Sequence, residues 1–144
     1  MADAEIFMKR FTELWRAPDP EAYASLWHTE GTLLHPGMAQ PIPAAEIPAY
    51  VARLVRLLPD ITLTPQRWAA QGDVVFVEWT ISATVAGEQV SWRGADRFTL
   101  RGSKAIEGVA YFDTLPIWAR VDPTLRRTDL DRLGLPSQVE APAT

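Results

Sequence analysis

The chain has 144 residues, of which 47% are hydrophobic, and its formal net charge at neutral pH is -4. This length is typical of one domain with its own apolar core. The acidic balance argues against a nucleic-acid-binding protein, because such proteins usually display a dominant basic face. The chain has no cysteine, which excludes disulfide bonds, thiolate catalysis and cysteine-bound zinc.

The N-terminal residues are acidic and lack the basic start and apolar stretch of a signal peptide. No apolar run approaches the length needed to span a membrane. We therefore expect a cytoplasmic protein without a membrane or nucleic-acid partner.

Three helices are predicted in the first 60 residues. Apolar spacing predicts the first helix over Ile6–Trp15. Asp19 and Pro20 are typical of the start of a second helix, which we expect to end near Trp27, because Asp caps a helix and Pro fits its first position. A third helix, ending near Pro59, should pack on the core through an apolar stripe formed by Ile47, Val51, Leu54 and Leu58.

From Ile61 onward the apolar residues alternate, which predicts strands. Short turns connect them, so neighbouring strands should pair antiparallel. The four predicted strands are Ile61–Ala70, Val74–Val85, Gln89–Leu100 and Ala105–Asp113. Asp122 and Pro123 then indicate a last short helix that ends before Gly134.

Helices followed by strands predict an α+β fold: a cone of three helices on a curved antiparallel sheet, whose open end is a pocket. We expect a single domain over residues 1–136 and a disordered tail over residues 137–144.

His35 and Asp96 are the first candidates for chemistry. His35 ends a short apolar run before Pro36, and Asp96 is the one charged residue on the inward face of its predicted strand. A neutral imidazole accepts protons at neutral pH, and desolvation raises the pKa of a carboxyl group, so the pair could serve as base and acid in one apolar cavity. The alternatives are a His35 bonded to a backbone carbonyl and an ionised Asp96 paired with Arg93 or Arg97.

Asp113 is a third candidate, although a residue at a strand end can instead cap a turn through Thr114. Aromatic residues at strand spacing usually belong to a core or an interface, and we expect some to line the pocket. The candidates for substrate contact are Phe11, Trp27, Trp79, Trp92, Phe98 and Phe112.

The chain resembles the nuclear transport factor 2-like superfamily, and within it the ketosteroid isomerases and SnoaL-type polyketide cyclases. The resemblance spans nearly the whole domain. The isomerases' general-base aspartate, which precedes a proline, corresponds to His35; their protonated aspartate corresponds to Asp96; and their helix-one tyrosine corresponds to Phe11. Ketosteroid isomerase is itself the standard example of a carboxylic acid kept neutral by an apolar site. This chain keeps the acid, changes the base and lacks that phenol.

The run Ala110-Tyr111-Phe112-Asp113 is similar to a cyclase pattern that ends in aspartate, and a histidine near position 35 also occurs in that branch. The resemblance thus implies a role for Asp113. Limonene-epoxide hydrolases, a third branch, have an acid where this chain has Ala110, so their triad is not matched.

The resemblance implies an enzyme without cofactor or metal: an isomerase or cyclase acting by acid-base catalysis on a hydrophobic, carbonyl-bearing polyketide, steroid or terpenoid-like molecule, in biosynthesis. It also implies a homodimer paired through the outer face of the sheet. The alternative is a non-catalytic ligand-binding or protein-interaction module with the same fold.

Overall fold

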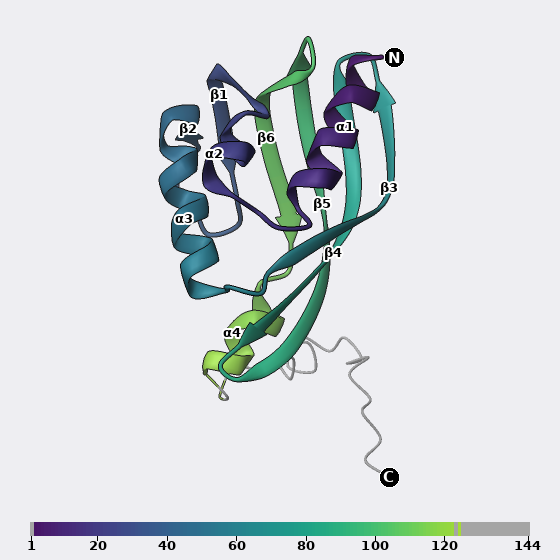
Figure 1. Cartoon of the computed structure of the whole chain (residues 1–144). Coiled ribbons are helices and arrows are strands. Elements are labelled where there is room, and N and C mark those ends of the chain that lie inside the picture. Colours follow the sequence, from purple (N-terminus) through teal and green to yellow (C-terminus); the bar gives the residue numbers. More distant parts are fainter. Residues whose placement is uncertain (1, 123, 125–144) are drawn as a thin grey trace.

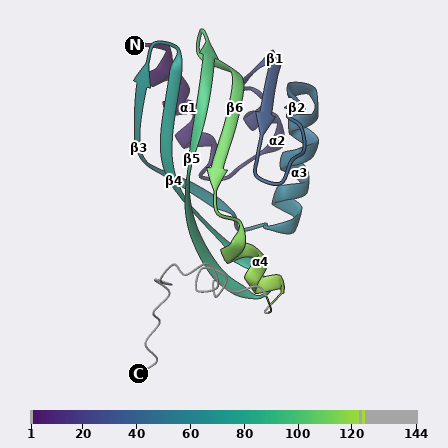
Figure 2. The same ribbon diagram turned by 180° about the vertical axis from the view of Figure 1, so that it is seen from behind.

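In the computed structural model, which describes residues 2–122 and 124, one curved sheet carries helices on its concave face (Figure 1). In chain order the elements are α1 Asp3–Leu14, α2 Pro20–Ala24, β1 Trp27–Leu34, β2 Ile42–Pro43, the short 3-10 helix η1 Ala44–Glu46, α3 Ile47–Leu57, β3 Thr62–Gln71, β4 Val74–Val85, β5 Glu88–Arg101, β6 Lys104–Phe112 and α4 Leu115–Val121. Seen from behind, the strands lie in front of α1 and α2 (Figure 2).

The three predicted helices are present. In α2 the Asp19 side chain accepts a hydrogen bond from the Ala22 N–H at 2.9 Å, and Pro20 occupies the first helical position, as the capping signal predicted. The helix ends at Ala24 rather than near Trp27, because Trp27 already begins β1.

The four predicted strands lie within one residue of their expected bounds and pair antiparallel in sequence order. The described sheet has six strands in the order β2-β1-β6-β5-β4-β3, and β1 joins β6 in parallel. The fold is the α+β cone predicted from the sequence.

The C-terminal prediction is tested in part. α4 follows directly after β6 and was not predicted. The helix expected before Gly134 and the predicted end of the domain at residue 136, with the tail beyond it, lie outside the described residues.

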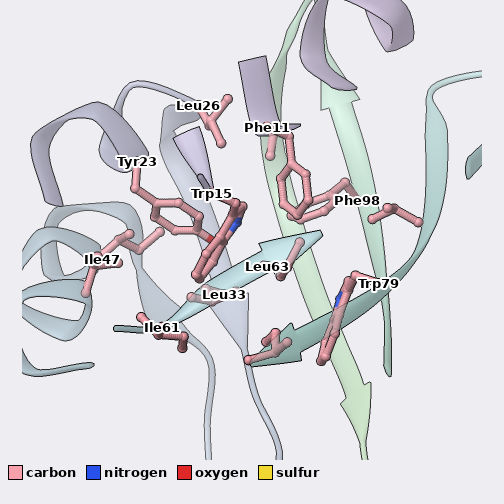
Figure 3. Close-up of a cluster of buried hydrophobic side chains, with 14 of the residues drawn as sticks. Phe11, Trp15, Tyr23, Leu26, Leu33, Ile47, Ile61, Leu63, Trp79 and Phe98 are labelled. Atoms are coloured by element: carbon pink, nitrogen blue, oxygen red, sulfur yellow. The ribbon is translucent and has the colours of Figure 1, made fainter. Parts of the chain in front are cut away.

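The core lies between α1 and the sheet. Phe7 and Phe11 of α1 are fully buried, and their ring centroids lie 4.9 Å and 5.5 Å from that of Phe98 on β5. Figure 3 shows Phe11 beside Phe98. Trp27 packs beside Phe98 over Gly108, where a Cβ atom would come within 2.4 Å of the indole. These aromatic contacts fix how the first helix lies on the sheet.

Replacing Ile47 by Ala should lower the free energy of unfolding by about 2–5 kcal/mol, because the side chain is fully buried in the core on α3. Leu57→Ala on the same helix is the control: Leu57 is 74% exposed, so its loss should change stability by less than about 0.5 kcal/mol. Denaturant unfolding measures both, and equal losses would contradict this packing of α3.

Candidate active site

A cavity of about 210 Å³ lies within the cone, between the sheet and α3. Its wall is mostly apolar and comes from α2, α3, α4, the sheet and the residue after α1. The residues lining it are Trp15, Tyr23, His35, Tyr50, Leu54, Leu58, Ile61, Leu63, Trp79, Ile81, Trp92, Asp96, Ala110, Phe112 and Ile117. His35 and Asp96, which are 61 positions apart in the chain, thus face one cavity.

His35 is held at the end of β1 by the hydroxyl of Tyr50 on α3. The distance between His35 Nδ1 and Tyr50 Oη is 2.6 Å. The Met38 N–H bonds back to the His35 carbonyl at 3.1 Å, which closes the turn through Pro36. Burial lowers the pKa of His35 to about 4, so the imidazole is neutral at pH 7. Its ring partner is a hydroxyl, not the backbone carbonyl considered as the alternative.

The direction of the His35–Tyr50 bond decides which ring nitrogen is basic. If Tyr50 donates, Nδ1 is occupied and Nε2 carries the proton. If Nδ1 carries the proton and donates to the Tyr50 oxygen, Nε2 has a free lone pair. The second arrangement prepares His35 as a proton acceptor while Tyr50 fixes the orientation of its ring.

Asp96 is a buried carboxyl group with no charged partner among the residues that the structure describes. The residue is 8% exposed, and burial raises the pKa of its carboxyl group to about 7. The neighbouring Trp79 indole N–H lowers this pKa by a smaller amount. Arg97 points to the other face of β5 and pairs with Glu107 at 2.8 Å, and Arg93 is exposed. The alternative of an Asp96–arginine ion pair is therefore not found among the described residues.

Two phenols in the cavity were missed by the sequence reasoning. Burial raises the pKa of Tyr23 and of Tyr50, and the nearby Asp96 charge acts in the same direction, so both hydroxyls stay protonated at neutral pH. Tyr50 lies three residues after Ile47 and one before Val51, on the apolar stripe that predicted α3. Its place on that stripe could have identified Tyr50 as a residue that faces the cavity. Phe11 has no hydroxyl where the isomerases have a tyrosine, but Tyr23 of α2 and Tyr50 of α3 supply two phenols.

The remaining candidates divide into two groups. Trp79, Trp92 and Phe112 line the cavity. Phe11, Trp27 and Phe98 are packed in the core and are not among the residues lining it. Alternation along a strand assigns a residue to a face of the sheet but not to a position along it, so core and cavity residues look alike in the sequence.

Asp113 lies at the exposed end of β6, outside the wall of the cavity. Its Oδ1 accepts a hydrogen bond from the Leu115 N–H at 2.9 Å, which ties the strand end to the first turn of α4. This hydrogen bond fits the alternative role of Asp113, in which the residue caps a turn. Within the part of the chain that the structure describes, no group of three His, Asp or Glu side chains is placed to hold a metal ion.

A cone with a mostly apolar cavity, lined by an imidazole, a carboxyl group and two phenols, is the arrangement of the NTF2-like fold. The chain belongs to the SnoaL-like domain family, whose model matches residues 8–108. This confirms the resemblance found in the sequence. A comparison with curated proteins gives no match. No helix among the described residues is long and apolar enough to cross a membrane.

Solved structures share this fold at low identity. TerC, co-crystallised with polyporic acid, has a TM-score of 0.74 and 22% identity over 84% of this chain and 99% of its own. IdmH of Streptomyces antibioticus, proposed to be a polyketide cyclase, has a TM-score of 0.72 and 16% identity over 82% and 97%. A protein of Catenulispora acidiphila with a ketosteroid isomerase-like fold has a TM-score of 0.71 and 17% identity over 90% and 93%.

The raised pKa of Asp96 predicts a pH-dependent effect of Asp96→Asn on stability. Between its ordinary value of 3.8 and about 7, folded Asp96 holds a proton that the unfolded chain has released, so folding loses stability as the pH rises through this range. Asparagine cannot ionise and avoids the loss. The melting temperature of Asp96→Asn relative to wild type should therefore rise from pH 4 to pH 7 and then level off.

His35 makes the folding stability rise with pH, because its pKa is lowered in the folded state. Both proteins contain His35, so this effect cancels in the difference between their melting temperatures. The melting temperatures of wild-type protein and Asp96→Asn are measured by thermal unfolding at the same pH values. A constant difference across the range would show that Asp96 is not buried as described.

Proposed function

We propose that the protein is a cofactor-independent isomerase or cyclase that moves protons on a hydrophobic, carbonyl-bearing small molecule. The observation that carries this proposal is the meeting of His35 and Asp96 in one apolar cavity. Burial lowers the pKa of the base and raises that of the acid, so a neutral acceptor and a neutral donor coexist near pH 6.

In the proposed reaction, Nε2 of His35 removes a proton from the carbon next to the carbonyl group. The C–H bond breaks, the N–H bond forms, and the electron pair moves to the carbonyl oxygen as an enolate. Asp96 donates a hydrogen bond to that oxygen. Returning the proton from His35 to another carbon gives an isomer. Alternatively, the enolate carbon attacks a second carbonyl group and closes a ring, and the alkoxide formed from that carbonyl group takes the proton back from His35. Such positioned groups each supply roughly 10²–10⁴-fold of rate.

A His35 pKa of about 4 makes a weak base in the empty cavity. The negative charge that develops on the enolate favours the imidazolium form, because opposite charges attract strongly in a site shielded from water. Tyr50 keeps its bond to Nδ1–H throughout, so the ring does not need to reorient when Nε2 is protonated.

The structural neighbours support the substrate class. TerC was crystallised with polyporic acid, and IdmH is proposed to be a polyketide cyclase. Extended to this chain, these names favour an oxygenated ring compound, formed in biosynthesis in the cytoplasm. The second candidate is a non-catalytic ligand-binding module, and the low pKa of His35 is the observation that favours it.

His35→Ala should separate the two functions. The assay follows exchange of the acidic C–H protons of 2-tetralone with D₂O by NMR, at pH 6. Wild-type protein should accelerate exchange, and His35→Ala should reduce the rate by at least about 100-fold with little change in affinity, because the base acts in the transition state. Asp96→Asn, which keeps a hydrogen-bond donor, should lose less than Asp96→Ala.

Two results of the exchange assay would contradict this proposal. If wild-type protein binds 2-tetralone without accelerating exchange, the binding-module function replaces the enzyme. If His35→Ala exchanges as fast as wild type, catalysis does not depend on this residue.

We also propose a homodimer formed through the outer face of the sheet. Phe76 of β4 and Tyr111 of β6 point outward and are 51% and 56% exposed, and Ala95 of β5 lies beside Tyr111 on the neighbouring strand. The ion pairs Arg67–Glu78 and Arg97–Glu107 flank these aromatic rings. Apolar groups surrounded by polar ones are typical of protein interfaces.

Light scattering at micromolar concentration should give the mass of a dimer. Phe76→Glu should shift the mass to that of a monomer, because it places a charge in the apolar part of the face. Leu57→Glu alters another exposed apolar residue, on α3, and should remain dimeric. A monomeric wild-type protein would reject the dimer.

A further inference from the structure

A groove on the outer face of the sheet lies directly behind one part of the cavity wall. His35, Ala110 and Phe112 line both the cavity and this groove. One layer of side chains therefore separates the two spaces at this point. The groove is completed by residues that do not line the cavity: Leu34, Pro36, Gly37, Met38, Val109 and Tyr111.

The wall is thin here because the sheet is incomplete beside the end of β6. β1 ends at Leu34, which pairs with Val109, whereas β6 continues to Phe112. Beyond Val109, β6 pairs only with β5 among the described strands. The turn after Leu34 brings His35 to this end of β6. The cone is thus closed at this position by side chains rather than by hydrogen-bonded backbone.

Ala110 leaves room between the two rings of this wall. The ring centroids of His35 and Phe112 are 6.3 Å apart, and the rings are inclined at 82°. Ala110 contributes only a methyl group beside them, so a larger side chain at this position would fill the space. On the groove side, Met38 Sδ accepts a hydrogen bond from the His35 N–H at 3.3 Å, which holds the Met38 side chain next to His35.

The cavity alone is too small for a large substrate. A buried apolar cavity of about 150 Å³ holds one benzene ring, and pockets for drug-sized ligands span roughly 300–1,000 Å³. The 210 Å³ found here suits one ring or two fused rings, so a longer substrate must extend beyond it. In the proposed reaction, the carbon that loses its proton lies about 3–3.5 Å from His35. A substituent on that carbon therefore meets the wall between the cavity and the groove.

The groove suits an apolar substituent. No Lys, Arg, Asp or Glu is among the described residues that line it. His35 adds no charge at pH 7, because burial lowers its pKa to about 4. A charged group placed in the groove would lose hydration without gaining an ion pair, whereas an alkyl chain would gain apolar contacts.

We propose that this groove is a subsite for an apolar substituent on the reacting carbon, which passes over Ala110 between His35 and Phe112 while the ring of the substrate occupies the cavity. The inference rests on the proposed function and specifies its substrate: a carbonyl compound of one or two fused rings, with an alkyl or aryl chain on the carbon next to the carbonyl group. Ala110 sets the width of the passage, and Val109 and Met38 contact the chain.

Calorimetric binding of 2-tetralone and 1-butyl-2-tetralone tests the groove, because the butyl chain is attached to an acidic carbon of the same ring system. Wild-type protein at pH 6 should bind the butyl compound at least about tenfold more tightly, since each buried methylene group favours binding. Val109→Asp places a charge in the groove and should reduce this ratio of affinities to less than about threefold. A change that affects both compounds equally cancels in the ratio.

Val74→Asp is the matched control. Val74 is also partly exposed on the outer face, at the start of β4, and does not line the groove. This variant should keep the wild-type ratio. Met38→Ala changes the groove from a turn rather than from the sheet, and should reduce the ratio about threefold or more. It carries the test if Val109→Asp does not fold.

A second copy of the chain is the competing occupant, because Tyr111 of the groove also belongs to the face proposed for the dimer. If Val109→Asp is a monomer in light scattering and keeps the wild-type ratio, the groove belongs to the subunit interface and the inference is wrong. Equal affinity of wild-type protein for the two tetralones would also overturn it.

Failure of this inference is distinct from failure of the proposed function. Accelerated proton exchange of 2-tetralone, without tighter binding of the butyl compound, rejects the groove and leaves the enzyme. Tighter binding that Val109→Asp removes, without proton exchange, rejects the enzyme and leaves the groove as part of a ligand-binding module.

Discussion

The site depends on the burial of one carboxyl group, Asp96, which has no countercharge within the described part of the chain. Alternation along β5 turns Arg97 to the outer face, where Glu107 engages it, and turns Asp96 inward among apolar side chains. An ionised carboxylate there would lose its hydration, and none of the described side chains would form an ion pair with it. Its pKa therefore rises toward neutrality, and the group that the cavity presents at pH 6 is a hydrogen-bond donor rather than a charge.

Burial also shifts the pKa of His35, but downward. Burial penalises whichever form is charged, so it raises the pKa of the acid and lowers that of the base. Between about pH 4 and pH 7 both groups are mainly neutral, and an apolar ligand can enter without displacing a charge. Proton transfer to His35 would then create two opposite charges inside a shielded cavity, where their attraction offsets part of the cost of forming them.

Sequence patterns predicted the parts of this structure that repeat locally. The period-two alternation gave β3 to β6, and the single charge on an apolar strand face identified Asp96. The phenol of Tyr50 escaped notice because the stripe on α3 was interpreted as packing, and its bond to His35 joins segments 15 residues apart. The contact of Trp79 with Gly94 depends on strand register, which the sequence does not reveal. The parallel pairing of β1 with β6 was not predicted either, because it depends on contacts between segments far apart in the sequence.

The concave face of β5 serves two purposes along its length. Toward its C-terminal end, Phe98 lies under Phe7 and Phe11 of α1, and this part forms a closed core. Toward its N-terminal end, Trp92 borders the cavity. Asp96 lies at the boundary, close enough to the core to be desolvated and far enough along the strand to reach a ligand. Moving the acid two residues toward Phe98 would bury it beyond reach of the cavity, and moving it two residues the other way would place it at Gly94, where any side chain collides with Trp79. The position of the acid is therefore set by where α1 stops covering the sheet.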